Sequence, residues 1–283
     1  MIDELRQQVK RYFLLQRISV ALAKAGVLQA LRQIDEANPL TWEFSAFSQN
    51  NEDGIIDYLT RRIQHPNRYF IEVGASNGVE NNTTWLGIAR KYSGLLIEGD
   101  EQSCKALDLL LRLGLCIGVN YRQLFVTKDS SHRIMELALW PNPDVFSLDI
   151  DGNDYHVVKS LLETGLRPKI FIVEFNSVYG PSKRMTIPYR EEFAAATTGA
   201  ASLYYGASIS AWRTLFDQHK YKFITVDSNG VNAFFVDPNE FDRTYLKRIR
   251  GLEFQENFLQ LQKFKIPWQE QFRLIEQEYF VAV

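Results

Sequence analysis

The stretch YFIEVGASNG, residues 69–78, decides the fold of this chain. Its first five residues are mostly aromatic or β-branched and predict a short buried strand, and the two glycines predict a tight turn after it. A helix is expected to begin near Asn81, just beyond the turn. A strand, a glycine turn and a helix in this order form the opening unit of a doubly wound α/β sheet.

The same alternation continues along the chain. Further strands are expected at residues 95–97, within 115–126, at 145–148 and at 169–173, with helical stretches between them. Beyond a helix over 209–219, an Asn-Gly turn joins strands at 221–226 and 231–236, which predicts an antiparallel hairpin. We therefore predict an α/β fold: a doubly wound, Rossmann-like, mostly parallel seven-stranded sheet with a C-terminal antiparallel hairpin, plus an N-terminal helical extension.

Three regions are expected. Residues 1–39 form an N-terminal helical extension, because apolar residues recur at helical spacing up to about Ile34. Gly26 is a possible break, so this extension is one long helix or two short ones, and its apolar stripe must face the domain or a second subunit, which makes it a candidate homo-oligomer contact. Residues 40–237 form the ligand-binding domain, and residues 238–283 form a C-terminal helical appendage.

The composition is that of a globular protein, with 46% hydrophobic and 23% charged residues among 283. A net charge of -2 argues against nucleic acid as a partner. No signal peptide and no transmembrane segment are expected, which makes the cytoplasm the expected location. Cys104 and Cys116 are expected to be buried free thiols.

Acidic residues follow the first two expected strands. The turn after the first strand has the spacing G-x-S-x-G, which differs from the dinucleotide-binding G-x-G-x-x-G. Glu72, at the end of that strand, would repel a pyrophosphate and suits a cationic ligand. Glu98 follows the next strand, where a carboxylate can accept both hydroxyls of a cofactor ribose.

A third acidic group follows two later strands. Asp149 and Asp151 end one strand, and Glu174 and Asn176 end the next, so the four side chains converge if these strands are neighbours. They could bind a substrate hydroxyl, deprotonate it, or hold Mg²⁺ or Mn²⁺ through oxygen ligands, and the sequence leaves these roles open. His156 is another candidate base.

A long loop over residues 177–189 follows Asn176 and is expected to select substrate. It contains two cations, Lys183 and Arg184, that are candidates for binding an anionic group.

Taken together, these motifs resemble the class I S-adenosylmethionine-dependent methyltransferases, and more narrowly the FkbM-type family of polysaccharide and natural-product gene clusters. The resemblance extends from about Trp42 to Val236. Its motifs are SQNNEDG at 48–54, FIEVGASNG at 70–78, IEGD at 97–100, SLDIDGNDY at 147–155, VEFNS at 173–177 and YGAS at 205–208. It implies O-methylation of a hydroxyl on a sugar, saccharide or related small molecule.

The resemblance also implies roles for individual residues. Cofactor contacts would come from Glu72, Gly74, Ala75, Ser76, Asn77, Gly78, Glu98 and Asp149. The resemblance places Asp149 near the transferred methyl, and the residues themselves make Asp149, Glu174 and His156 the catalytic candidates. Ser76 departs from the glycine that many members of the wider class have at this position. Two other hypotheses about the function stay open: an NAD-dependent oxidoreductase and a non-catalytic Rossmann-like binding module.

Overall fold

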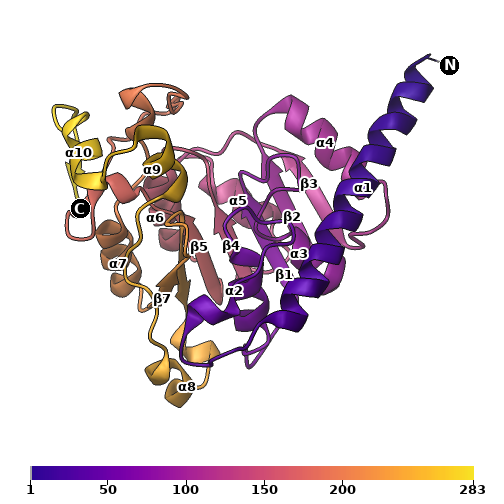
Figure 1. Ribbon diagram of the computed structural model, residues 1–283, viewed down its shortest axis with the longest axis horizontal. Helices are drawn as coiled ribbons and strands as arrows, with labels where there is room; N and C mark the ends of the chain where they lie inside the picture. Colours follow the sequence, from indigo (N-terminus) through magenta and orange to yellow (C-terminus); the bar gives the residue numbers. More distant parts are fainter. Residues whose placement is uncertain (1) are drawn as a thin grey trace.

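A seven-stranded sheet forms the centre of the computed structural model, which describes residues 2–283 (Figure 1). The strand order is β3-β2-β1-β4-β5-β8-β7. The strands are β1 (Tyr69–Val73), β2 (Ser93–Glu98), β3 (Val119–Gln123), β4 (Val145–Leu148), β5 (Ile170–Glu174), β7 (Lys222–Val226) and β8 (Asn232–Val236). All neighbours pair in parallel except β8, which is antiparallel to both β5 and β7. The predicted fold is confirmed.

The connections reverse direction at β1, because the chain adds β2 on one side of it and β4 on the other. Such a switch point opens a crevice at the carboxyl ends of the strands, where ligands bind in sheets of this kind. The register aligns Val73 with Leu148, and the Asp149 N–H donates to the Val73 carbonyl at 3.1 Å. The turn after β1 therefore lies directly beside the end of β4.

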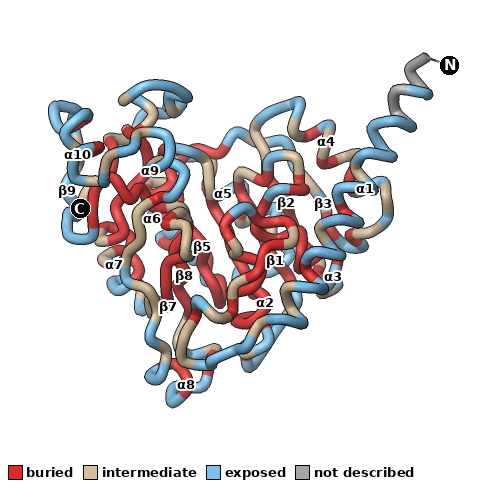
Figure 2. Tube along the Cα trace, in the orientation of Figure 1, coloured by how far each residue is buried: buried red, intermediate tan, exposed pale blue. Residues whose placement is uncertain are grey.

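Helices cover both faces of the sheet. Those of the central domain are α2 (Glu52–Thr60), α3 (Thr84–Ala89), α4 (Glu101–Leu111), α5 (Ser131–Leu137), α6 (Asp154–Glu163) and α7 (Ile209–Gln218), with short 3-10 helices η1 (Pro39–Trp42), η2 (Ser177–Tyr179), η3 (Ala200–Leu203) and η4 (Pro238–Glu240). Alternate residues along β1 enter two separate cores, Phe70 with α2, α3 and α4, and Ile71 with α5, α6 and α7. The central strands are thus buried on both sides (Figure 2), whereas the edge strand β3 is mostly exposed.

The predicted N-terminal extension is one continuous helix, α1 (Ile2–Leu31), and Gly26 does not break it. It runs along one side of the molecule, and its first turns extend past the rest of the chain (Figure 1). Ile18 and Ala25 are buried in the core that contains Phe70. By length and composition alone, residues Gln8–Leu31 are also apolar enough to cross a membrane, with a mean hydropathy of 1.2.

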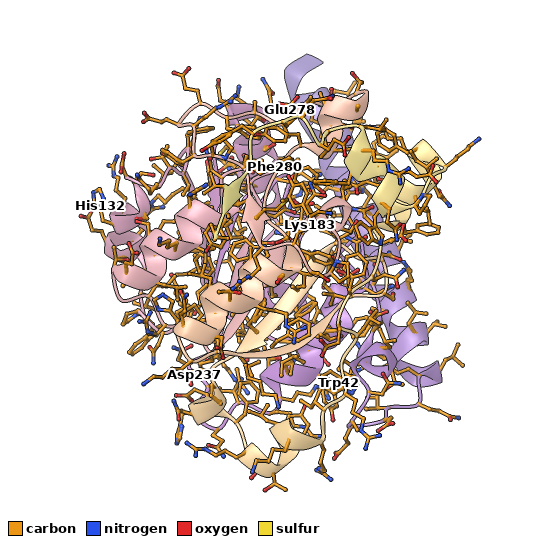
Figure 3. All side chains as sticks on the ribbon, turned by 90° about the vertical axis from the view of Figure 1, so that its left-hand side faces the viewer. Trp42, His132, Lys183, Asp237, Glu278 and Phe280 are labelled. Carbon is orange, nitrogen blue, oxygen red and sulfur yellow. The ribbon has the colours of Figure 1, made fainter. Side chains whose placement is uncertain are left out.

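The C-terminal appendage contains α8 (Arg243–Arg248), α9 (Phe258–Phe264) and α10 (Trp268–Arg273), and it ends in a short strand, β9 (Val281–Ala282). This strand pairs with β6 (Met185–Thr186), a pairing that the sequence did not predict. The Lys183 ammonium lies 4.1 Å from the ring centroid of Phe272, on the side of the molecule that Figure 3 presents. The loop expected to select substrate is thus partly packed against the appendage. Cys104 and Cys116 are buried free thiols, as predicted.

Candidate active site

Two cavities adjoin at the carboxyl ends of the strands. The first, of about 490 Å³, lies beyond β2 and β4 and has apolar walls together with the acids Glu98 and Asp100. The second, of about 340 Å³, lies beyond β1, β5 and β8 and is lined mainly by carboxylates and amides. Gly74, Ser76, Asp149 and Asp151 line both cavities. The turn after β1 and the end of β4 therefore form the junction between them.

Gly74 allows the close contact at this junction. Its φ is +81°, and a Cβ built on it would lie 1.7 Å from the carbonyl oxygen of Asp149. Only glycine combines this backbone conformation with so close an approach. Ser76 also has a positive φ, 48°, and its N–H donates to Glu98 Oε2 at 2.7 Å. The turn is thereby connected to the ends of both β2 and β4.

Replacing Gly74 by alanine is expected to destabilise the protein by at least about 2 kcal/mol, because the new Cβ would push the turn away from β4 in an unfavourable conformation. Thermal unfolding measures this effect. Gly26→Ala is the matched control: a Cβ there meets nothing within 4 Å, and alanine favours the helix. A Gly74→Ala protein that unfolds at the wild-type temperature would contradict the described packing.

Backbone donors fix the carboxylate of Glu98 at the wall of the first cavity. Its Oε2 accepts from the Ser76 N–H, and its Oε1 accepts from the Asp100 N–H at 2.8 Å. Each carboxylate oxygen has a further lone pair that can accept from a ligand. Ile97, Phe125 and Val126 form the apolar part of the same cavity. This combination suits a flat aromatic base joined to a group with neighbouring hydroxyls.

Three carboxylates meet at the second cavity. Asp149, Asp151 and Glu174 each offer an oxygen, and these oxygens lie within 4.8 Å of one another. Burial, followed by repulsion between neighbouring acids, raises the pKa of Asp149 and of Glu174 well above the ordinary range. A hydrogen bond from Tyr205 opposes the rise in the pKa of Glu174 but does not cancel it. Such a group favours a bound proton or cation that reduces the repulsion between its members.

Two other acids hold the surrounding loops. Glu72 is buried and accepts from the Asn82 N–H at 2.8 Å and from the Thr83 hydroxyl at 2.5 Å. Burial raises its pKa to about 7, and it still lines the second cavity. Asp154 accepts from the N–H groups of Ile150 and Gly152, which shapes the loop that carries Asp151.

The remaining turn residues support the cavities without lining them. Ala75 is fully buried, and its N–H donates to the Ile97 carbonyl at 3.1 Å. Asn77 Oδ1 accepts from the Val79 N–H at 2.8 Å. Gly78 leaves space for Leu107, whose Cδ2 would lie 2.6 Å from an added Cβ. Among the predicted turn residues, Glu72, Gly74 and Ser76 reach the cavities and these three do not.

His156 and Asn176 lie apart from the carboxylate group. The Nε2 of His156 is 2.8 Å from the Ile187 carbonyl oxygen, and the ring lines neither cavity. Asn176 is fully buried, where its Nδ2 donates to the Leu203 and Tyr205 carbonyls at 2.8 and 3.0 Å. Its Oδ1 accepts from the Val178 N–H at 3.0 Å, so the amide is occupied within the protein.

Several polar residues of the second cavity were not predicted. Asn232 Nδ2 donates to Glu52 Oε1 at 2.7 Å, and the Asn50 N–H donates to Glu52 Oε2 at 2.6 Å. Two buried amide atoms in this wall, Asn81 Nδ2 and Asn232 Oδ1, have no hydrogen-bond partner among residues 2–283. The motif at 48–54 was visible in the sequence, but no signal connected it with Asn232.

No family model matches the chain, and no curated protein matches it. Solved structures resemble it at low identity. An O-methyltransferase from Bacillus cereus in complex with SAH is 17% identical, with 78% of this chain and 89% of that chain covered and a TM-score of 0.43. TomG from Streptomyces achromogenes is an O-methyltransferase involved in tomaymycin synthesis and was solved with SAM. It is 15% identical, with 75% of this chain and 93% of that chain covered and a TM-score of 0.44.

The strand order of the sheet is itself diagnostic of the fold. Five parallel strands around a switch point, followed by a hairpin that inserts one antiparallel strand beside β5, are the arrangement found in class I methyltransferases. Dinucleotide dehydrogenases usually continue with parallel units. The chain therefore has the fold of the class I S-adenosylmethionine-dependent methyltransferases.

Proposed function

We propose that this chain is an S-adenosylmethionine-dependent O-methyltransferase that acts on a hydroxyl of a saccharide or a related polyhydroxylated small molecule. The observation that carries the proposal is the junction of the two cavities at Gly74 and Asp149. One cavity presents a positioned carboxylate and apolar walls, and the other presents a group of carboxylates with raised pKa values. A methyl donor on one side and its acceptor on the other would meet at this junction.

The first cavity fits the adenosine part of the cofactor. Glu98 would accept the two ribose hydroxyls, while Ile97 and Phe125 would contact the adenine. When bound, S-adenosylmethionine supplies an activated methyl group on a positively charged sulfur. The carboxylate group beside the junction keeps the negative charge that such a cation requires. Glu72, behind the turn, adds to the same field.

The second cavity fits an uncharged acceptor with several hydroxyls. Its charged lining is acidic, namely Glu52, Glu72, Glu80, Asp149, Asp151 and Glu174. An acceptor with a phosphate or carboxylate would be repelled there. The unpartnered amide atoms of Asn81 and Asn232 require one acceptor and one donor, and a hydroxyl supplies both. These features support a neutral saccharide.

The carboxylate group supplies the base. Because Asp149 and Glu174 repel each other, one keeps a proton while the other is ionised. We assign the base to Glu174, which takes the proton of the acceptor hydroxyl as that oxygen forms its bond to the methyl carbon and the carbon–sulfur bond breaks. Asp149 and the Gly74 turn hold the reacting atoms in line. His156 has no part in this step.

Calorimetric titration tests the proposal. We expect the wild-type protein to bind S-adenosylhomocysteine and to give no heat with NADH. Incubation with S-adenosylmethionine and a panel of methyl glycosides should then yield methylated sugar, detected by mass spectrometry. Binding of NADH alone would favour the oxidoreductase, and cofactor binding without transfer to any sugar would favour a non-catalytic module.

We further propose a divalent metal at Asp149, Asp151 and Glu174, whose oxygens fit Mg²⁺ or Mn²⁺. Such an ion would polarise the acceptor hydroxyl. We expect EDTA to abolish turnover and Mn²⁺ to restore it. Calorimetry should also show Mn²⁺ binding that is weakened at least tenfold by Asp151→Asn. Undiminished turnover in EDTA would contradict the metal site. The proton shared by Asp149 and Glu174 would then be what reduces the repulsion between these carboxylates.

A further inference from the structure

Helix α1 has two apolar faces, and the protein covers only one of them. The inner face packs on the core through Ile18 and Ala25, with Leu14, Ala21 and Leu28 beside them. The outer face carries a stripe at helical spacing, here called the outer stripe, made of Leu5, Val9, Tyr12, Phe13, Val20, Val27 and Leu31. Val20 is 68% exposed and Leu31 is 74% exposed. Figure 2 shows that α1 is exposed along most of its length.

The charges along residues 8–31 of α1 have one sign. Residues 8–31 contain four basic residues, Lys10, Arg11, Arg17 and Lys24, and no acidic residue. The whole chain, in contrast, carries a net charge of -2. Lys10, Arg17 and Lys24 follow one another at steps of seven residues, which places them in a row beside the outer stripe. Exposed apolar residues flanked by cations are typical of a helix that lies on an anionic membrane surface.

The inner face argues against a helix that crosses the membrane. Residues 8–31 have the length and hydropathy to span one. Spanning would, however, expose Ile18 and Ala25, which are 2% and 0% accessible in the core. The Arg17–Glu80 ion pair also ties the helix to a residue that lines the second cavity. An arrangement parallel to the surface keeps these contacts and buries the outer stripe alone.

The charges of α1 also argue against a second copy of this chain as the partner that covers the outer stripe. If two outer stripes faced each other in an antiparallel pair, the basic row of one helix would lie against the basic row of the other. Neither helix has an acidic residue between positions 8 and 31 to neutralise these charges. Anionic lipid headgroups would neutralise them, at about 1 kcal/mol for each Lys or Arg near the surface.

We propose that α1 is a membrane-surface anchor, with its outer stripe inserted at the headgroup boundary of an anionic lipid bilayer and with Lys10 and Lys24 of its basic row on the headgroups, while Arg17 stays paired with Glu80. The anchor is independent of methyl transfer. Because Arg17 pairs with Glu80, docking would hold the rim of the second cavity close to the bilayer.

Vesicle flotation with the full chain tests the anchor. We expect the wild type to float with phosphatidylcholine vesicles containing about one third phosphatidylglycerol, and to bind pure phosphatidylcholine at least tenfold more weakly. Val20→Glu/Val27→Glu should reduce binding at least tenfold, because it places charge on the outer stripe. Gln102→Glu/Gln218→Glu adds the same charge at exposed positions outside α1 and should bind as the wild type does. Lys10→Gln/Lys24→Gln should bind about thirtyfold more weakly.

Sedimentation velocity on the same proteins tests the alternative, in which a second copy of this chain covers the outer stripe. A wild type that ignores anionic vesicles and sediments as a dimer, which Val20→Glu/Val27→Glu converts to a monomer, would overturn the proposal and assign the outer stripe to a second copy. A monomer that does not float would overturn it as well. Circular dichroism and thermal unfolding of each variant confirm that the fold is intact and keep this test separate from the proposed activity.

Discussion

Replacing Glu174 by glutamine is expected to lower kcat by about 10²–10⁴-fold, the usual contribution of a general base, while the affinity for S-adenosylhomocysteine stays within about twofold. Glutamine keeps the size of the side chain but cannot take the acceptor proton. Steady-state methyl transfer to the best methyl glycoside measures kcat. Glu163→Gln, an exposed change on α6, is the control and should behave as the wild type does.

The pH profile adds a second readout for the same residue. Because burial and the neighbouring Asp149 raise the pKa of Glu174, kcat should fall with decreasing pH at pH values above those at which an ordinary carboxylate titrates. Only the ionised carboxylate accepts a proton, so the rate rises with pH and then levels off. The Glu174→Gln variant should lack this rise. A wild-type kcat that stays constant from pH 8 to pH 5 would contradict a base with a raised pKa.

Replacing Glu98 by alanine is expected to weaken binding of S-adenosylhomocysteine by about 100-fold or more. Two hydrogen bonds from the ribose hydroxyls to a carboxylate would be lost, each contributing about 1.5–3 kcal/mol. The N–H groups of Ser76 and Asp100 would also lose their acceptor, which loosens the turn. Calorimetry gives the dissociation constant directly.

A matched control for this variant is Glu101, the first residue of α4. Glu101 is exposed and pairs with Lys105, so Glu101→Ala removes the same charge a few residues away without touching the first cavity. It should bind S-adenosylhomocysteine as the wild type does. Equal affinity in Glu98→Ala and Glu101→Ala would remove the ribose role from Glu98.

The sheet was predictable because its strands carry local signals. The expected strands at 69–73 and 145–148 agree residue for residue with β1 and β4, which are apolar runs with a charged residue or glycine just beyond. The pairing of β6 with β9 was not predictable. Each strand has two residues, too few for a periodic pattern, and the pairing depends on the C-terminal segment folding back.

Part of the site was predictable for the same reason. Glu98, Asp149 and Glu174 end parallel strands, and parallel strands bring their carboxyl ends to one edge. Asn176 has the same sequence context, but its side chain accepts from the Val178 N–H and caps η2, a local bond that asparagine forms readily. Asn232 begins the one antiparallel strand, so its place beside Glu52 depends on tertiary pairing alone.

The most direct test of the methyltransferase site is a crystal structure of this chain with S-adenosylhomocysteine. We predict adenine against Phe125, the ribose hydroxyls on the Glu98 carboxylate, and the sulfur at the junction beside Gly74 and Asp149. The second cavity should stay open next to that sulfur. Ligand density at any other place, or a saturated crystal with both cavities empty, would contradict the account.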